Sequence, residues 1–247
     1  MLAVIRIVLL AVALVLISLY AIIFSLLRPF HRNNVQHAAK LVGKLHKLIG
    51  LSVEVRVPYD VSKHEPMVYV CNHQNSYDLF TVASAVQPHT VSIGKKSLKW
   101  IPFFGQMYWL TGNILIDRKN TNKAMGTISS AADKIREKKL SVWLFPEGTR
   151  SYGRGLLKFK TGAFRTAVQA DVPIVPVCAS NTCGVIDLNR WDNGKMIIEY
   201  LPPVYLSEED KSDVRGLTDR VRASMLEKIN ELSVETGTEL PAKKGDK

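Results

Sequence analysis

The sequence contains little cysteine and several common motifs are missing from it. Only Cys71, Cys178 and Cys183 are cysteines, an odd number without a CxxC pair. Neither a disulfide framework nor a zinc knuckle is therefore indicated, and a reducing compartment fits best. The sequence lacks a G-x-S-x-G elbow, internal repeats and low-complexity segments. A length of 247 residues then allows one large domain, or one domain with an appendage.

Acidic residues are also scarce relative to basic ones. The 33 lysines and arginines outnumber 22 aspartates and glutamates, which gives a net charge of +11 and a pI of about 9.6. This balance suits an anionic partner such as nucleic acid, an acidic protein, a phosphorylated substrate or an anionic membrane. A basic surface that only keeps the protein soluble fits equally, so charge alone names no function.

Charge is missing completely from residues 7–27, "IVLLAVALVLISLYAIIFSLL". As a helix, this run is roughly 30 Å long, about the thickness of the hydrocarbon layer of a bilayer. A cleaved signal peptide is disfavoured because the run is long and ends in "LLRP" without a small-x-small site. A buried core helix is disfavoured because the run is apolar on every side. We therefore predict a membrane helix.

Basic residues follow the apolar run, which predicts that the main body lies on the cytoplasmic side. Only Arg6 precedes the run, whereas it is followed by Arg28, Arg32, Lys40, Lys44 and Lys47. Residues 35–49 show helical spacing of apolar positions opposite the three lysines, and Pro29 separates this helix from the first. It is either an amphipathic interfacial helix on the bilayer or a helix packed on the domain with a solvated basic face.

The rest of the chain alternates short apolar runs with helical segments. We predict strands at 52–57, 67–71, 90–93, 112–116, 141–145, 174–178 and 196–201, and helices at 78–86, 121–137, 160–170 and 212–233. This order indicates an α/β fold with a mixed, partly parallel sheet flanked by helices, behind the N-terminal membrane helix and the amphipathic interfacial helix. The expected units are membrane-anchoring helices in 1–50, an α/β domain in 51–234 and a flexible tail in 235–247.

Polar residues cluster where predicted strands end, which is where α/β sheets collect ligands. His73 and Asp78 follow strand 67–71 in "CNHQNSYD". If Asn75 or Ser76 caps the next helix, Asp78 lies in its first turn and can reach back to His73. A histidine oriented by a carboxylate is a general base. This short pattern alone also fits a structural loop histidine.

A thiol nucleophile is the other chemistry that this stretch offers. Cys71 lies two residues before His73, but it continues an apolar strand. We interpret Cys71 as a small core residue, so the base would act on a substrate hydroxyl.

Two further clusters offer positive charge for a phosphate. "FPEGTRS" (145–151) sets Arg150 on a glycine-containing loop, where a guanidinium can hold phosphate with two hydrogen bonds. The alternative is a turn with a surface ion pair between Glu147 and Arg150. "SIGKKSLKWIPFFGQ" (92–106) offers Lys95 and Lys96 for phosphate, or aromatic side chains for the headgroup zone of a membrane. "VPIVPV" (172–177) has two prolines and predicts an edge or bulged strand.

The order of these clusters is more specific than any one of them. "NHQNSYD", "GNILIDR", "FPEGTRS" and "VPIVPV", spread over about a hundred residues behind a membrane helix, resemble the glycerolipid acyltransferase family. The resemblance covers nearly the whole chain, and "GKKSLKWIPFFGQMYWLTGNILIDR" is especially similar to bacterial members. One departure is Leu115, where the family often has an aromatic residue.

The resemblance implies transfer of a fatty acyl group from a thioester of acyl carrier protein or coenzyme A to the 2-hydroxyl of lysophosphatidate, giving phosphatidate. It implies the bacterial inner membrane, with the catalytic domain on the cytoplasmic side. No metal or other cofactor is expected, because a thiolate leaves readily. His73 would remove the hydroxyl proton and Asp78 would orient His73. The expected substrate-binding residues are Arg150, Arg118 and Lys95 for the phosphate, and Glu147, Gly148 and Thr149 around the acceptor.

Three alternatives remain at this stage. The acceptor could be glycerol-3-phosphate or another lysophospholipid. The chain could be a non-catalytic protein that binds anionic lipid, although that would leave the His73–Asp78 pair without a purpose. A nucleic-acid binder is disfavoured because the basic residues crowd beside an apolar run of bilayer length.

Overall fold

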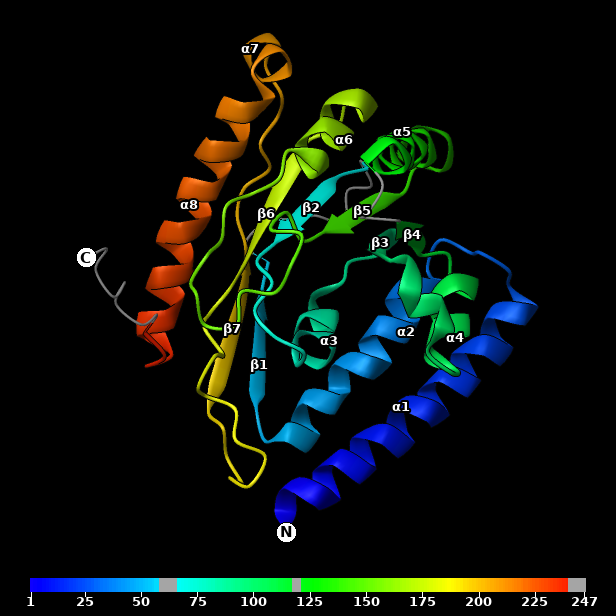
Figure 1. Cartoon of the computed structure of the whole chain (residues 1–247), viewed down its shortest axis with the longest axis vertical. Helices are drawn as coiled ribbons and strands as arrows, with labels where there is room; N and C mark the ends of the chain where they lie inside the picture. The colour runs from blue at the N-terminus through cyan, green and yellow to red at the C-terminus, as the bar shows by residue number, and fades with distance from the viewer. Residues whose placement is uncertain (58–65, 117–120, 240–247) are drawn as a thin grey trace.

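A mixed seven-stranded sheet forms the centre of the computed structural model, which describes residues 1–57, 66–116 and 121–239 (Figure 1). The strand order is β1-β7-β6-β2-β5-β3-β4. The five strands from β6 to β4 in this order are parallel, whereas β7 is antiparallel to β6 and parallel to β1. The mixed α/β fold predicted from the sequence is confirmed. The strands are β1 Ser52–Arg56, β2 Val68–Cys71, β3 Thr90–Lys95, β4 Ile114–Ile116, β5 Ser141–Leu144, β6 Ile174–Ala179 and β7 Lys195–Tyr200.

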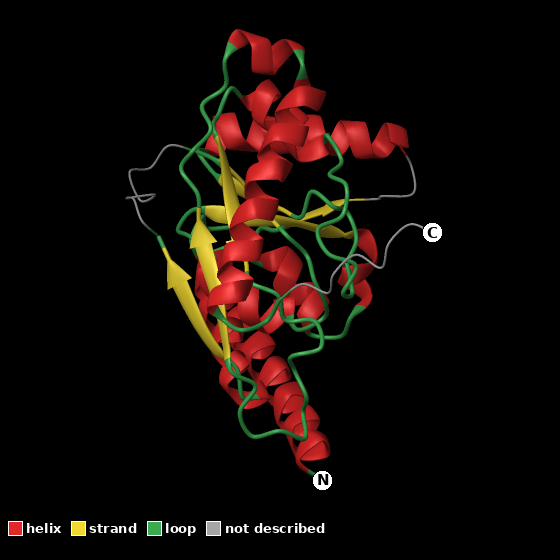
Figure 2. Ribbon diagram, turned by 90° about the vertical axis from the view of Figure 1, so that its left-hand side faces the viewer, coloured by secondary structure: helices red, strands yellow, loops and turns green. Residues whose placement is uncertain are grey.

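Helices cover both faces of this sheet (Figures 1 and 2). One face carries α5 Thr121–Lys138, α6 Gly162–Ala170 and α8 Val214–Glu235, which is preceded by α7 Glu208–Ser212. On the other side lie α1 Leu2–Leu27, α2 Asn34–Gly43, η1 Lys44–Ile49, α3 Asp78–Thr81, η2 Val82–Ala85, η3 Lys96–Trp100 and α4 Phe104–Leu110. Strand β2 contributes to the hydrophobic cores on both faces of the sheet. Val68 and Val70 face the α8 side, and Tyr69 and Cys71 face the α1 side. This alternation follows from the two-residue period of a strand.

Strand β6 lies inside the sheet, so the edge alternative predicted for 172–177 is wrong. Each of its residues is buried, between β2 and β7. A proline is tolerated there because Pro176 faces the chain just beyond the end of β7, where its carbonyl oxygen accepts a hydrogen bond from the Leu201 N–H at 2.9 Å. The missing N–H therefore falls outside the β6–β7 ladder.

The segment predicted as one helix at 35–49 forms α2 and the 3-10 helix η1. Its apolar side is buried against α1, α3, η2 and β3, through Val35, Ala38, Val42, Leu45 and Ile49. The alternative of a helix packed on the domain is therefore correct for this apolar side. Because these side chains are buried in the protein, they are not available to enter a bilayer. Lys40, Lys44 and Lys47 are exposed on the opposite side.

Helix α1 lies along the domain rather than projecting from it (Figure 1). Its inward positions include Arg6, Ser18, Ala21 and Ser25, so most of its larger apolar side chains face outward. Near its start, the Arg6 guanidinium donates to the carbonyl oxygens of residues 49, 188, 190 and 191. Just past its end, Phe30 packs edge-on against Trp109 of α4 at 5.4 Å. Both ends of α1 are thus attached to the same body.

Candidate active site

The predicted site residues come from strands whose C-terminal ends lie side by side. Strands β2, β5, β3 and β4 are neighbours in the sheet and run in the same direction. The chain leaves β2 toward His73, β5 toward Glu147 and Arg150, and β3 at Lys95. Parallel strands thus bring three clusters separated in sequence to one edge of the sheet.

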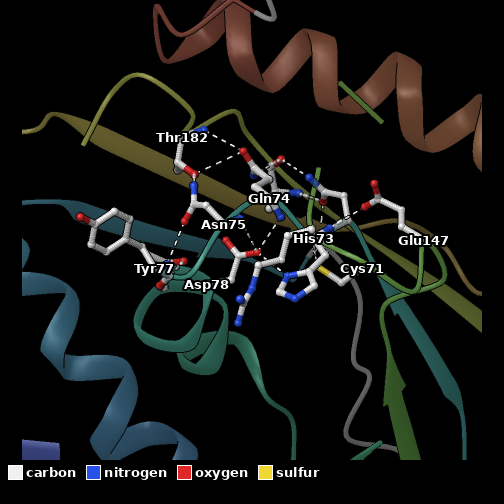
Figure 3. Close-up of polar contacts among 12 residues, drawn as sticks. Cys71, His73, Gln74, Asn75, Tyr77, Asp78, Glu147 and Thr182 are labelled. Carbon is white, nitrogen blue, oxygen red and sulfur yellow. Dashed lines mark hydrogen bonds and ion pairs between the residues drawn. The ribbon is translucent and has the colours of Figure 1, made fainter. Parts of the chain in front are cut away.

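His73 and Asp78 form a hydrogen-bonded pair (Figure 3). The His73 Nδ1 lies 2.6 Å from the Asp78 Oδ2. The carboxylate side chain is only 2% exposed, and the imidazole is 18% exposed. An Nδ1–H that donates to this carboxylate leaves the lone pair on Nε2, the ring nitrogen that can take a proton from a substrate. The geometry predicted for this pair is therefore present.

The same carboxylate oxygen also holds the loop that carries His73. It accepts the backbone N–H groups of Gln74 at 2.7 Å and Asn75 at 3.3 Å. The predicted helix cap is wrong in detail, because Tyr77 is the residue that precedes α3 and no side chain caps the helix. Asn75 instead accepts the Tyr77 N–H at 2.9 Å, which makes an Asx turn before the helix.

Asparagine and glutamine side chains tie this loop to the end of β6. Asn72 both accepts from and donates to the backbone of Ala179, each at 2.9 Å. Gln74 donates to the Ser180 carbonyl and accepts the Thr182 N–H, each at 2.8 Å. These contacts continue the pairing of β2 with β6 after the strands end. These contacts were not predicted, although the polar residues on both sides of His73 indicate that the loop needs hydrogen-bond partners.

The imidazole of His73 lies flat on the ring of Phe145. The two ring centroids are 4.1 Å apart, with an angle of 19° between the planes. This contact fixes the plane of the imidazole in addition to the bond from Asp78. Sequence reasoning missed it, because nothing in "FPEGTRS" shows that its first residue faces a histidine 72 positions earlier.

Glu147 is buried and both of its carboxylate oxygens are used inside the protein. One accepts the His73 N–H at 2.7 Å and the other accepts the Leu157 N–H at 3.0 Å. Burial raises the pKa of this carboxyl group above its ordinary value. Glu147 therefore joins two loops beneath the site, and Figure 3 shows it on the other side of His73 from Asp78. The alternative of a Glu147–Arg150 ion pair is not found among the described residues.

Arg150 lies partly exposed on the loop after β5. Its Nη1 donates to the Tyr152 hydroxyl at 3.2 Å, and its Nε is buried with no partner among the described residues. The interaction with Arg150 lowers the pKa of Tyr152 below its ordinary value. No carboxylate pairs with this guanidinium in the described part of the chain, so its positive charge remains available to an anion.

The other predicted substrate-binding residues take different positions. Lys95 ends β3 and Thr149 lies on the loop after β5, and both are exposed. Gly148 adopts the left-handed conformation, with φ of 70°, and a side chain there would meet Lys160. Arg118 lies outside the described residues. No variant or bound substrate tests these roles, so they stay predictions.

Cys71 is a core residue, as interpreted from the sequence. It is fully buried beside Tyr69, and burial raises the pKa of its thiol well above the usual value. A thiol held neutral in this way is a poor nucleophile. In the described parts of the chain, no three His, Cys, Asp or Glu side chains are grouped to hold a metal ion. That the reaction needs no metal remains a prediction.

Comparisons with known proteins agree with this geometry. The acyltransferase family model matches residues 52–180. The 1-acyl-sn-glycerol-3-phosphate acyltransferases of Salmonella typhimurium and Escherichia coli are 49% and 48% identical over 235 residues, which cover 95% of this chain and 96% of each relative. The crystal structure of the 1-acyl-sn-glycerophosphate (LPA) acyltransferase PlsC from Thermotoga maritima matches with a TM-score of 0.63 and 25% identity, over 90% of this chain and 97% of that one. The chain therefore belongs to the acyltransferase family, together with these bacterial 1-acyl-sn-glycerol-3-phosphate acyltransferases.

Proposed function

We propose that this chain transfers a fatty acyl group from an acyl thioester to the sn-2 hydroxyl of 1-acyl-glycerol-3-phosphate, and that the product is phosphatidate. The observation that carries the proposal is the His73–Asp78 pair, with a buried carboxylate 2.6 Å from Nδ1 and the opposite ring nitrogen left for a substrate. The names of the bacterial relatives support this acceptor and this reaction.

The chemistry follows from the placement of the pair. His73 Nε2 removes the proton of the acceptor hydroxyl while Asp78 stabilises the imidazolium that forms. The hydroxyl oxygen attacks the thioester carbonyl directly, so no acyl-enzyme forms. The C–S bond then breaks, and the thiolate leaves with the proton that the His73 imidazolium carries, which returns His73 to its neutral form. The backbone N–H groups of Thr149 and Arg150, which have no acceptor among the described residues, are candidates to bind the negative oxygen of the tetrahedral intermediate.

The acceptor phosphate would be held by Arg150, with Lys95 and Arg118 as further cations. Support comes from the partly exposed Arg150 guanidinium, which pairs with no carboxylate among the described residues, and from the exposed end of β3 at the same edge of the sheet. Glu147 would act indirectly, because its carboxylate already binds the backbone of His73 and Leu157. Its effect on the acceptor would therefore come through the loops that it joins.

The apolar outer face of α1 supports attachment to a membrane. The helix is long and apolar enough to enter a membrane, and large side chains such as Val12, Leu16 and Ile23 are exposed. Since both ends of α1 contact the domain, we propose that this helix lies in the plane of one leaflet and does not cross the bilayer. Tryptophan is enriched at membrane–water interfaces, and exposed tryptophans adjoin both ends of α1: Trp191 lies against Arg6, and Trp109 packs on Phe30. The cytoplasmic leaflet of a bacterial inner membrane is the proposed location.

Product analysis tests the proposed function. The purified full-length chain would be incubated in anionic vesicles with lysophosphatidate and a labelled acyl thioester of carrier protein or, separately, of coenzyme A. We expect labelled phosphatidate from at least one donor, and none from His73→Ala that is equally folded and membrane-bound. A wild-type chain that binds phosphatidate but consumes neither thioester would contradict the proposal and favour the non-catalytic lipid-binding protein. Glycerol-3-phosphate and other lysophospholipids, tested in parallel, identify the acceptor.

A further inference from the structure

Helix α8 reaches the loop that holds the catalytic histidine. Arg222 is a partly buried residue of α8, and its Nε donates to the Leu157 carbonyl oxygen at 2.8 Å. Its Nη2 donates to the neighbouring carbonyl oxygen of Leu156. In the described residues Arg222 forms no ion pair, so its charge is directed at two backbone carbonyls. Arg222 lies 42 positions beyond the matched family region, which ends at residue 180.

The peptide that Arg222 holds is bonded on its other side to the site. The Leu157 N–H donates to Glu147, and the same carboxylate accepts the His73 N–H. A continuous set of hydrogen bonds therefore runs from Arg222 through the Leu157 backbone and Glu147 to the backbone of His73. Leu156, packed in the core on the α8 side, anchors the same segment.

The segment 147–157 is also bonded to His73 near its N-terminal end. The Ser151 N–H donates to the His73 carbonyl oxygen at 2.9 Å. Residues 152, 153 and 155 all have positive φ values, which makes the loop a tight turn. Both backbone groups of His73 are thus bonded to the segment 147–157, and Arg222 holds the far end of that segment. A displacement of that end would be passed to the imidazole.

We propose that Arg222 is a positioning residue for His73, which acts through Leu157 and Glu147 without touching substrate. The inference rests on the proposed acyl transfer. A rigid, forked guanidinium can hold two adjacent carbonyls at once, whereas a lysine ammonium holds them as a point charge. Because a small misplacement of a catalytic group can cost a large factor in rate, loss of this fork should reduce turnover more than acceptor binding.

The test compares kcat and KM for lysophosphatidate in folded, vesicle-bound enzyme. Arg222→Met retains an unbranched apolar stem, and we expect kcat to fall about tenfold, or about 1.4 kcal/mol in the barrier, with KM within about twofold. Arg222→Lys should recover part of the loss. Arg220→Met is the matched control, since Arg220 lies on the same helix and pairs with Asp210, away from the site. Its kcat per folded enzyme should equal that of the wild type.

A double-mutant cycle adds a measurement that would show no coupling if Arg222 only stabilised the fold. Glu147→Gln and Arg222→Met interrupt the same set of bonds, so their effects on kcat should be clearly less than multiplicative. An Arg222→Met enzyme with wild-type kcat, or a loss equal to that of Arg220→Met, would overturn the inference. A multiplicative double variant would do the same. If the wild type itself forms no phosphatidate, it is the proposed function that fails.

Discussion

Replacement of Asp78 by asparagine separates the two contributions of this carboxylate. A single oxygen, Oδ2, accepts from the His73 ring and from the N–H groups of Gln74 and Asn75. An amide oxygen in the same place can keep all three contacts, so Asp78→Asn removes the negative charge while the loop keeps its shape. The amide nitrogen would then replace Oδ1, which is buried with no partner among the described residues. We expect this to cost about 1–3 kcal/mol of stability.

The kinetic magnitude follows from the charge that is lost. An imidazolium and a carboxylate in contact, with charge centres about 4 Å apart, attract each other by about 4 kcal/mol at an effective dielectric constant of about 20. Part of this attraction is replaced by the amide dipole. With a factor of ten per about 1.4 kcal/mol, kcat should fall about 10²- to 10³-fold. KM for lysophosphatidate should change little, because Asp78 is not expected to touch the acceptor.

The assay is steady-state acyl transfer by purified enzyme in vesicles, normalised to folded protein by circular dichroism. Asp78→Ala provides the comparison, since it also removes the hydrogen bonds that hold the loop. We expect it to be less active than Asp78→Asn and to unfold at a lower temperature. If Asp78→Asn keeps kcat within about threefold of the wild type, the carboxylate charge has no role in turnover and the reasoning is refuted.

Two other predictions follow from the site and from α1. Arg150→Ala should raise KM for lysophosphatidate about 10- to 100-fold, the equivalent of one charge-assisted contact, and Arg150→Lys should restore only part of it; an unchanged KM in both variants would remove Arg150 from the phosphate site. Leu16→Glu with Ile23→Glu on the outer face of α1 should release the protein from anionic vesicles in sedimentation assays. Val234→Glu, an equally exposed apolar position on α8, should stay bound; equal binding of both proteins would exclude α1 as the membrane contact.

Much of the fold could be predicted because apolar periodicity marks strands and helices independently of their partners. All seven predicted strands exist within a few residues of the expected positions. Periodicity does not, however, predict the position of a strand within the sheet. The two prolines of 172–177 suggested an edge, but Pro176 is tolerated in the interior because its missing N–H faces the chain beyond β7.

The candidate site was predictable where the residues lie close in sequence. His73 and Asp78 are five positions apart, so local geometry alone brought them together. Contacts between distant segments were not predictable, such as the stacking of Phe145 on His73 and the bonds from Glu147 to two loops. The same limit applies to α2 and η1, because an amphipathic pattern shows that one side is buried and does not show what buries it.

The attachment of α1 at both ends has a consequence for the order of events during synthesis. The carbonyl groups that bind Arg6 include that of Arg190, 184 positions later in the chain. Strand β1 likewise pairs only with β7 among the described strands, and β7 begins at Lys195. At translation rates of about 5–20 residues per second, α1 leaves the ribosome roughly 10–40 s before these partners exist. During that interval the 26-residue helix can contact only earlier segments such as α2 and α4, and its outer face remains apolar and exposed. We therefore expect the nascent chain to be handed to the membrane first, so that the enzyme assembles its catalytic domain while already tethered to the surface that carries its lipid substrate.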